Sequence, residues 1–210
     1  MTKVRLLFAV AIVFGLVLTY PYLRLDIGDS RLEMRDRLQY AVLVVHIFTA
    51  LVALALGPLQ FMPGIRARRR THRVIGRVYL LAGVLPSAVA TIPVAIWSGR
   101  LLTQVGLTTA AVLWLVTGGL AYRAARRRDF AAHRAWMTRN YALTFLAVTA
   151  RVLVPVLLLA SIPFGRADPV SLIPIGQTLG WIINLIVVEI LIRRPPRPGF
   201  RARPGVEESS

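Results

Sequence analysis

The sequence predicts an all-α, polytopic membrane protein with six transmembrane helices. Three observations support this fold class. First, 56% of the 210 residues are hydrophobic and the mean hydropathy is +0.64, which is too apolar for an ordinary soluble domain. Second, the apolar runs reach the ~20 residues that a helix needs to cross a bilayer. Third, the arginines stand in short clusters between these runs, as they do in multi-pass membrane proteins.

Six segments are long and apolar enough for a transmembrane helix: 6–23, 38–62, 75–97, 102–122, 138–163 and 170–192. Lys3 and Arg5 precede the first segment, as in a signal peptide. The residues TYPYL at its end lack the small-residue pattern of a cleavage site, so we interpret the segment as a retained signal-anchor helix. We expect a six-helix transmembrane domain over 1–194. Residues 195–210 are rich in proline and arginine and should form a disordered, basic cytoplasmic tail.

The distribution of positive charge predicts the orientation. Of the 26 lysines and arginines, 19 belong to the N-terminus, the loops near residues 66–77 and 123–139, and the C-terminal tail; only six belong to the opposite side. Such a bias predicts that both termini are cytoplasmic. We expect the arginine loops to contact anionic lipid headgroups. The net charge of +17 does not indicate nucleic-acid binding, because it is divided among short loops between apolar runs.

A weak internal repeat links the second and third segments to the fourth and fifth. RARRRTHRVIGRVYLL (66–81) and RAARRRDFAAHRAWMTRNYAL (123–143) both pass from an arginine cluster to His-Arg, a further arginine, a tyrosine and a new helix. Both hairpins would run the same way through the membrane, which makes this a parallel repeat. The repeat would place His72 and His133 at equal depth.

His72 and His133 are candidate axial ligands of a b-type haem. Haem iron accepts an imidazole on each side, and helix bundles commonly hold such cofactors. Neighbouring arginines could pair with the haem propionates; these are Arg73, Arg77, Arg134 and Arg139. The alternative is that both histidines are border residues in the headgroup layer beside lipid-binding arginines.

Two further polar residues lie inside apolar segments. His46 is about 12 Å from the outer border of the second segment, and Arg151 is about 20 Å from the inner border of the fifth. Ionisable side chains at such depth indicate a functional site. We expect His46, Arg151 and Gln177 to form a polar cluster, with Asn184 as another amide partner. The cluster would be a ligand or anion site, or else an interhelical hydrogen-bond network.

Several kinds of chemistry lack the residues they need. The chain has no cysteine, which excludes disulfides, thiol chemistry and iron–sulfur clusters. No catalytic triad, glycine-rich phosphate loop, HExxH motif or pair of carboxylates occurs in the apolar segments. Hydrolase and nucleotide chemistry of the familiar types are therefore excluded.

Two longer stretches resemble a known family. They are GPLQFMPGIRARRRTHRVIGRVYLL and AHRAWMTRNYALTFLAVTARV. Both are similar to the bacterial integral-membrane family called domain of unknown function 2306, in which a second-helix histidine, a GP-x-QF turn and two HR-containing elements recur. In this chain the shared positions are His46, Gly57, Pro58, Gln60, Phe61, His72, Arg73, Gly76, Arg77, Tyr79, His133, Arg134, Trp136, Met137, Arg139, Tyr141 and Arg151. The resemblance covers about residues 40–160 and implies a bacterial cytoplasmic (inner) membrane protein. It implies no particular activity.

The arrangement of histidines also resembles that of cytochrome b561-type proteins, which have six helices and two haems. In that family the inner haem is held by the third and fifth helices, where this chain has His72 and His133. The outer haem is held by the second and fourth helices, and here only the second carries a histidine, His46. The resemblance thus implies one haem rather than two.

Three functions are consistent with these observations. The first is a b-type haem protein that transfers electrons to or from a quinone, a metal chelate or a redox partner protein. The second is a non-haem transporter or small-molecule binding protein that uses His46 and Arg151. The third is an accessory subunit of a larger membrane complex, in which the histidines serve packing and lipid contact.

Overall fold

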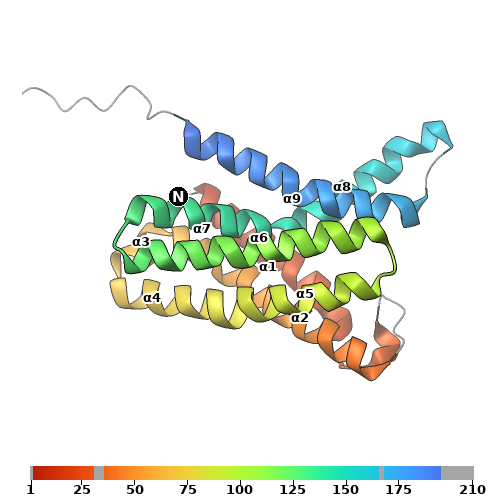
Figure 1. Cartoon of the computed structure of the whole chain (residues 1–210), viewed down its shortest axis with the longest axis horizontal. Helices are drawn as coiled ribbons and strands as arrows, with labels where there is room; N and C mark the ends of the chain where they lie inside the picture. The colour runs from red at the N-terminus through yellow and green to blue at the C-terminus, as the bar shows by residue number, and fades with distance from the viewer. Residues whose placement is uncertain (1, 31–35, 166–167, 195–210) are drawn as a thin grey trace, which may run out of the picture.

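Helices form from the long apolar runs because a helix pairs its internal backbone N–H and C=O groups without water. The computed structural model describes residues 2–30, 36–165 and 168–194; within them the regular structure is helical and no strand occurs. This confirms the all-α class (Figure 1). The α-helices are α1 (Thr2–Thr19), α2 (Arg37–Leu56), α3 (Pro63–Ala67), α4 (Arg69–Val78), α5 (Leu85–Trp97), α6 (Leu101–Arg126), α7 (Phe130–Thr144), α8 (Leu146–Ser161) and α9 (Pro169–Arg193). Shorter helical turns are η1 (Tyr20–Tyr22), η2 (Ile27–Asp29), η3 (Pro58–Phe61), η4 (Tyr79–Val84) and η5 (Ile162–Phe164).

Five helical segments of the described chain are long and apolar enough to cross a membrane. They are Arg37–Phe61, Arg69–Trp97, Leu101–Arg126, Leu146–Phe164 and Val170–Arg193. The first expected segment corresponds to α1 and η1, in which the apolar stretch is the shorter Phe8–Tyr22. The total of six transmembrane helices therefore stays a prediction. The expected tail, 195–210, lies outside the described residues.

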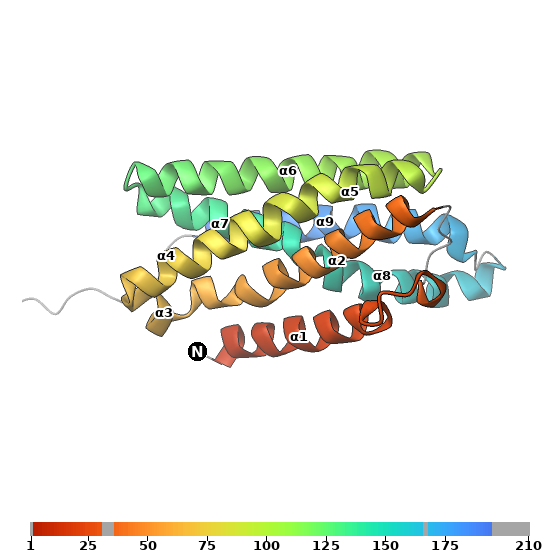
Figure 2. The same cartoon turned by 90° about the horizontal axis from the view of Figure 1, so that it is seen from below.

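The helices form a bundle in which α6 occupies one side and α1 the other (Figure 2). α6 packs against α5, α7 and α9, and α8 packs against α9. α2 packs against α5 and η4, while α1 rests on α2. The middle of the bundle is thus surrounded by helices that are distant in the sequence.

The third expected segment, 75–97, is longer than predicted. Its helix begins at Arg69 and continues through α4, the π-helical turn η4 and α5 to Trp97. His72 therefore lies within a helix and not in the loop before one. Arginine is a good helix former, which explains why the cluster extends the helix instead of ending it.

The fifth expected segment, 138–163, is two helices rather than one. The first, α7, already begins at Phe130, where the side chain of Asp129 caps the backbone N–H of Ala132. It ends at Thr144, and α8 begins after Phe145. The Thr144 hydroxyl donates to the carbonyl of Asn140, a back-bond that bends helices. Pro155, in contrast, lies inside α8 without interrupting it.

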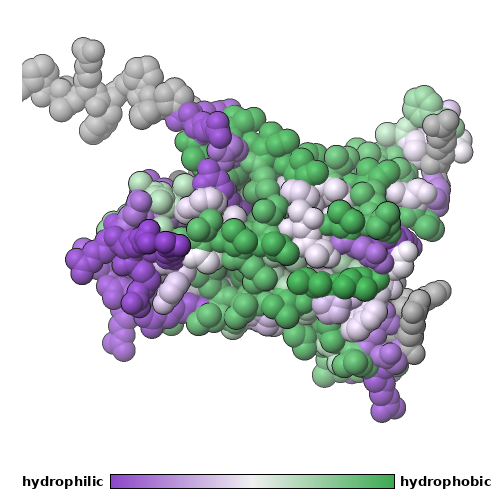
Figure 3. Space-filling model, in the orientation of Figure 1, coloured by the Kyte–Doolittle hydropathy of each residue, from purple (hydrophilic) through white to green (hydrophobic). Residues whose placement is uncertain are grey.

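Hydrophilic side chains gather at one end of the face that Figure 3 shows, and apolar side chains cover most of its middle. That end contains the connection from α3 to α4 and the connection from α6 to α7, whose arginines are exposed. The first residues of α1 and the last residues of α9 also lie on this side of the bundle (Figure 1). We call it the arginine-rich end. The cytoplasmic orientation of this end and the predicted internal repeat both stay predictions.

Candidate functional site

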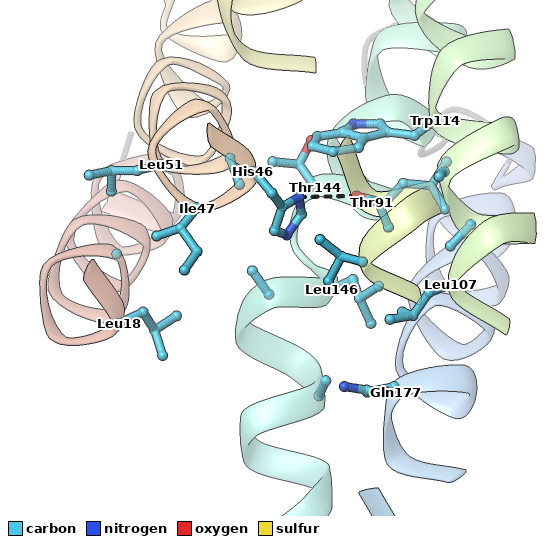
Figure 4. A pocket seen from close by; sticks show the side chains of 18 of the residues that line it. Leu18, His46, Ile47, Leu51, Thr91, Leu107, Trp114, Thr144, Leu146 and Gln177 are labelled. Carbon is cyan, nitrogen blue, oxygen red and sulfur yellow. Dashed lines mark hydrogen bonds between the residues drawn. The ribbon is translucent and has the colours of Figure 1, made fainter. Parts of the chain in front are cut away.

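A cavity of about 350 Å³ lies in the half of the bundle that faces away from the arginine-rich end. Six long helices, α1, α2, α5, α6, α8 and α9, contribute to its wall together with the end of α7. Most of the wall is apolar, including Leu18, Ile47, Leu51, Leu107 and Leu146 (Figure 4). The polar groups on it are few, so each of them matters for what the cavity can hold.

His46 projects from α2 into this cavity (Figure 4). Its Nδ1 atom faces α5, where it lies 3.1 Å from the Ser87 carbonyl oxygen and 3.0 Å from the Thr91 hydroxyl oxygen. The Ser87 hydroxyl is 3.1 Å from the same nitrogen. Ser87 and Thr91 are four residues apart, so they share a helix face. That spacing within an apolar segment was the available sequence signal for these two residues, and the sequence prediction did not use it.

Arg151 and Gln177 lie on the wall of the same cavity. The Arg151 guanidinium donates through Nη1 to the Ala147 carbonyl at 2.9 Å, one turn earlier on α8. The Oε1 atom of Gln177 is buried and has no hydrogen-bond partner within the described chain. Figure 4 shows Gln177 reaching from α9 into the space below His46. The structure thus brings together three of the four residues that the sequence grouped.

Asn184, the fourth residue that the sequence grouped, makes hydrogen bonds between helices. Its amide donates to the Ala142 carbonyl at 3.0 Å, and its Oδ1 atom accepts from the Thr149 hydroxyl at 2.9 Å. These bonds join α9 to α7 and α8. Asn184 is therefore an interhelical tie, and it is not among the residues that line the cavity.

A buried hydrogen-bond network lies beside the cavity, and the sequence prediction missed it. The Tyr79 hydroxyl is 2.6 Å from Asn140 Oδ1 and 2.9 Å from the Thr144 hydroxyl. The Trp114 indole N–H donates to that same threonine at 3.0 Å. Thr144 and Trp114 also line the cavity. An asparagine within an apolar segment signals such a network, but the partners of its side chain come from two other helical elements, η4 and α6.

His72 and His133 meet at the other end of the bundle. Their ring centroids are 6.4 Å apart and the ring planes are nearly perpendicular, at 89°. The Nδ1 atom of His133 lies 2.9 Å from the Ala121 carbonyl oxygen. The Nδ1 atom of His72 is buried and lacks a partner in the described part of the structure. The two residues are thus adjacent, as a shared ligand would require.

The arginines named with this pair differ in their surroundings. Arg73, Arg77 and Arg134 are exposed. Arg139 instead bonds to Glu189 at 2.7 Å, and its guanidinium lies 4.7 Å from the centre of the Trp136 ring. Glu189 also bonds Arg193 at 2.7 Å. Arg139 therefore ties α7 to α9, whereas the other three are directed to the surface.

Comparisons with known proteins give one match, to a family model. No curated protein and no solved structure matches the chain. A family model described as "Predicted membrane protein (DUF2306)" matches residues 43–192. This range contains both histidine sites and the cavity-lining residues of α2 to α9, and it spans more than half of the chain. The protein therefore belongs to the DUF2306 family of predicted membrane proteins.

Proposed function

We propose that this protein binds a small lipophilic molecule in the cavity around His46. The observation that carries the proposal is the cavity itself, because a volume of about 350 Å³ with mostly apolar walls and a few convergent polar groups is typical of small-molecule sites. The polar side chains among the lining residues are those of Thr19, Tyr22, His46, Thr91, Trp114, Thr144, Arg151 and Gln177.

The location of the cavity supports a lipophilic rather than a polar ligand. It lies mostly among helices whose segments are apolar enough to cross a membrane, and apolar side chains cover most of the face that Figure 3 shows. A strongly polar molecule would lose its hydration there, and most of the wall could not replace the lost hydrogen bonds. A lipophilic molecule buries apolar surface against the leucines and needs few polar partners.

The proposal can be tested by filling the cavity. Ala147 lines it, so Ala147→Phe should occupy the space of the ligand. The matched control is Leu81→Phe, since Leu81 is 64% exposed and is not among the cavity-lining residues. Organic extracts of the three purified proteins would be compared by mass spectrometry. We expect a lipophilic molecule in near-stoichiometric amount from the wild type and the control, and at least about a tenfold loss from Ala147→Phe, because overpacking a site excludes its ligand.

Two results would contradict the binding function. One is a wild-type protein that carries no such molecule. The other is an equal amount of the same molecule in all three proteins, which would indicate lipid bound elsewhere on the apolar surface.

A second candidate function is electron transfer by one b-type haem between His72 and His133. The supporting observation is the 6.4 Å between their ring centroids. Imidazole nitrogens lie about 2 Å from the metals they bind, so two rings on opposite sides of one metal have centroids roughly 6 Å apart. His133 also directs Nδ1 at the Ala121 carbonyl, the second bond that metal-binding histidines typically make. Bound haem would supply reversible one-electron chemistry.

The residues around the pair fit this candidate in part. Among the described residues no group of three or more His, Cys, Asp or Glu side chains is placed to hold a metal ion, but a haem needs only the two histidines. Arg73, Arg77 and Arg134 are exposed and available to propionates, whereas Arg139 is engaged with Glu189. The Nδ1 atom of His72 is buried and has no hydrogen-bond partner among the described residues, so it is available to a ligand.

Visible absorption of the purified protein tests the haem. With haem supplied during expression, we expect a Soret band, and sharp α and β bands after dithionite reduction. His72→Ala and His133→Ala should lose them, while His46→Ala should keep them as the matched histidine control. A colourless but folded wild type, or colour that persists in both inner variants, would exclude the haem.

A further inference from the structure

We infer that the ligand of the cavity carries a hydroxyl group, as a phenol or an alcohol, and donates it to Nε2 of His46. This inference rests on the proposed binding function and names the chemical class of the ligand. It follows from the contacts of the imidazole, from the direction in which its second nitrogen points, and from the charges on the cavity wall.

The contacts of Nδ1 favour a proton on that nitrogen, because they include a carbonyl oxygen. The Ser87 carbonyl oxygen, 3.1 Å away, can only accept a hydrogen bond. A proton on Nδ1 gives this carbonyl a ring donor, whereas an unprotonated Nδ1 would place two lone pairs opposite each other. The Thr91 hydroxyl donates to the same carbonyl at 2.8 Å, and the Ser87 hydroxyl donates to the His46 carbonyl at 3.2 Å. With the hydroxyl protons in these two bonds Nδ1 receives no donor, and we assign the Nδ1–H tautomer to His46.

The second nitrogen, Nε2, then holds a lone pair. Figure 4 shows the ring edge opposite Thr91 directed into the cavity. In the described chain the hydrogen bonds of the His46 ring are made by Nδ1 alone. A neutral imidazole accepts at its unprotonated nitrogen, so the cavity presents a hydrogen-bond acceptor to its ligand.

The charges on the wall narrow the class of donor. An ammonium ligand would need a carboxylate, and no Asp or Glu is among the described residues that line the cavity. Arg151, on the same wall, repels a cation. A neutral donor remains, and a hydroxyl is the smallest one. Its oxygen also keeps lone pairs for a donor such as the Gln177 amide, which Figure 4 places on the other side of the space.

A matched series of three probes tests the inference on the wild-type protein. The probes are 4-hexylphenol, 4-hexylanisole and 4-hexylbenzoate, which share the ring and chain but differ in the polar group. Binding is measured by calorimetry at pH 7.5 with the protein in phosphatidylcholine nanodiscs, and empty nanodiscs give the partition background. We expect the phenol to bind about tenfold more tightly than the anisole, since one buried hydrogen bond changes an affinity by roughly that factor.

Variants assign this preference to His46. In His46→Phe the difference between phenol and anisole should fall to within twofold, because phenylalanine keeps the ring and removes the acceptor. Leu81→Phe, which changes an exposed residue outside the cavity, should keep the full difference. The comparison of probes on the wild type needs no variant, so the inference stays testable if His46→Phe does not fold.

Three outcomes would overturn the inference, and they differ in what else they affect. Equal binding of phenol and anisole would exclude the hydroxyl contact but leave the binding function in place. Tightest binding of the benzoate, lost in Arg151→Gln, would show an anion site. Absence of saturable binding for all three probes would contradict the proposed function together with the inference.

Discussion

At the scale of single residues, Asn140 is a buried polar side chain that needs hydrogen-bond partners inside the bundle. Its side chain is 0% exposed. The amide donates to the Trp114 carbonyl at 2.7 Å and to the Thr117 hydroxyl at 2.9 Å, and the amide oxygen accepts from Tyr79 at 2.6 Å. The hydrogen-bond partners of its side chain all lie on other helical elements. Asn140 therefore links α7 to both α6 and η4.

Replacing Asn140 should destabilise the bundle. Asn140→Leu keeps the approximate volume but removes the donor and the acceptor, and buried groups without partners cost about 1–3 kcal/mol in the free energy of unfolding. Tyr79→Phe removes a single hydroxyl and should cost about 1 kcal/mol. Unfolding by dodecyl sulfate, followed by circular dichroism in dodecylmaltoside micelles, measures both. An Asn140→Leu protein as stable as the wild type would show that the network contributes nothing.

At the scale of elements, α2 and η4 pack closely because one of the two residues that meet is a glycine. A Cβ atom built at Gly83 would lie 2.9 Å from the backbone nitrogen of Ala53 and 3.0 Å from its Cα. Ala53 and Tyr79, on the same two elements, are both completely buried. Small residues allow membrane helices to approach to this distance, where dispersion contacts replace the missing hydrophobic drive.

Gly83→Ala should therefore separate the two elements and lower the free energy of unfolding by about 1–3 kcal/mol, because the obstacle is backbone and cannot rotate away. Gly119→Ala is the matched control. A Cβ at Gly119 meets nothing within 4 Å, and alanine favours a helix by up to about 1 kcal/mol. The same dodecyl sulfate titration measures both variants. Equal destabilisation by the two alanines would mean that close packing at Gly83 is not what holds α2 to η4.

At the scale of the whole molecule, charge is divided unequally between the two ends. The exposed arginines of the α3–α4 and α6–α7 connections lie at the arginine-rich end (Figure 3). The cavity around His46 lies in the other half. If the positive-inside bias holds, the His72–His133 pair faces the cytoplasm and the cavity is nearer the outer surface.

Labelling of single cysteines tests this orientation, and the chain suits it because it contains no cysteine. The variants are Ser98→Cys and Arg127→Cys. Ser98 lies in the exposed turn between α5 and α6, and Arg127 lies in the exposed turn between α6 and α7. We expect a membrane-impermeant maleimide to label position 98 in intact bacterial cells. Position 127 should react at least about tenfold less until the membrane is permeabilised, because the bilayer excludes the charged reagent. The reverse labelling would place the arginine-rich end outside.

The sequence alone determined the features that depend on local pattern. The all-α class and the apolar segments follow from hydropathy along the chain, and the HR-containing elements indicated the family that the match over 43–192 confirms. His46, Arg151 and Gln177 could be singled out because a polar residue in an apolar run is visible without a structure. Their shared position on one cavity wall agrees with the predicted cluster, although its ligand role stays a proposal.

Only the tertiary structure decided which of these side chains meet, and on which atoms. Asn184 pairs with Thr149 rather than joining the cavity, and Arg139 bonds to Glu189. The Ser87 carbonyl oxygen lies 3.1 Å from Nδ1 of His46, a contact between α2 and α5. Such pairings depend on how far each helix is rotated about its axis and on where it bends, as at Phe145. Rotation and bending result from many weak contacts between segments far apart in the chain, and these contacts leave no periodic signal in the sequence.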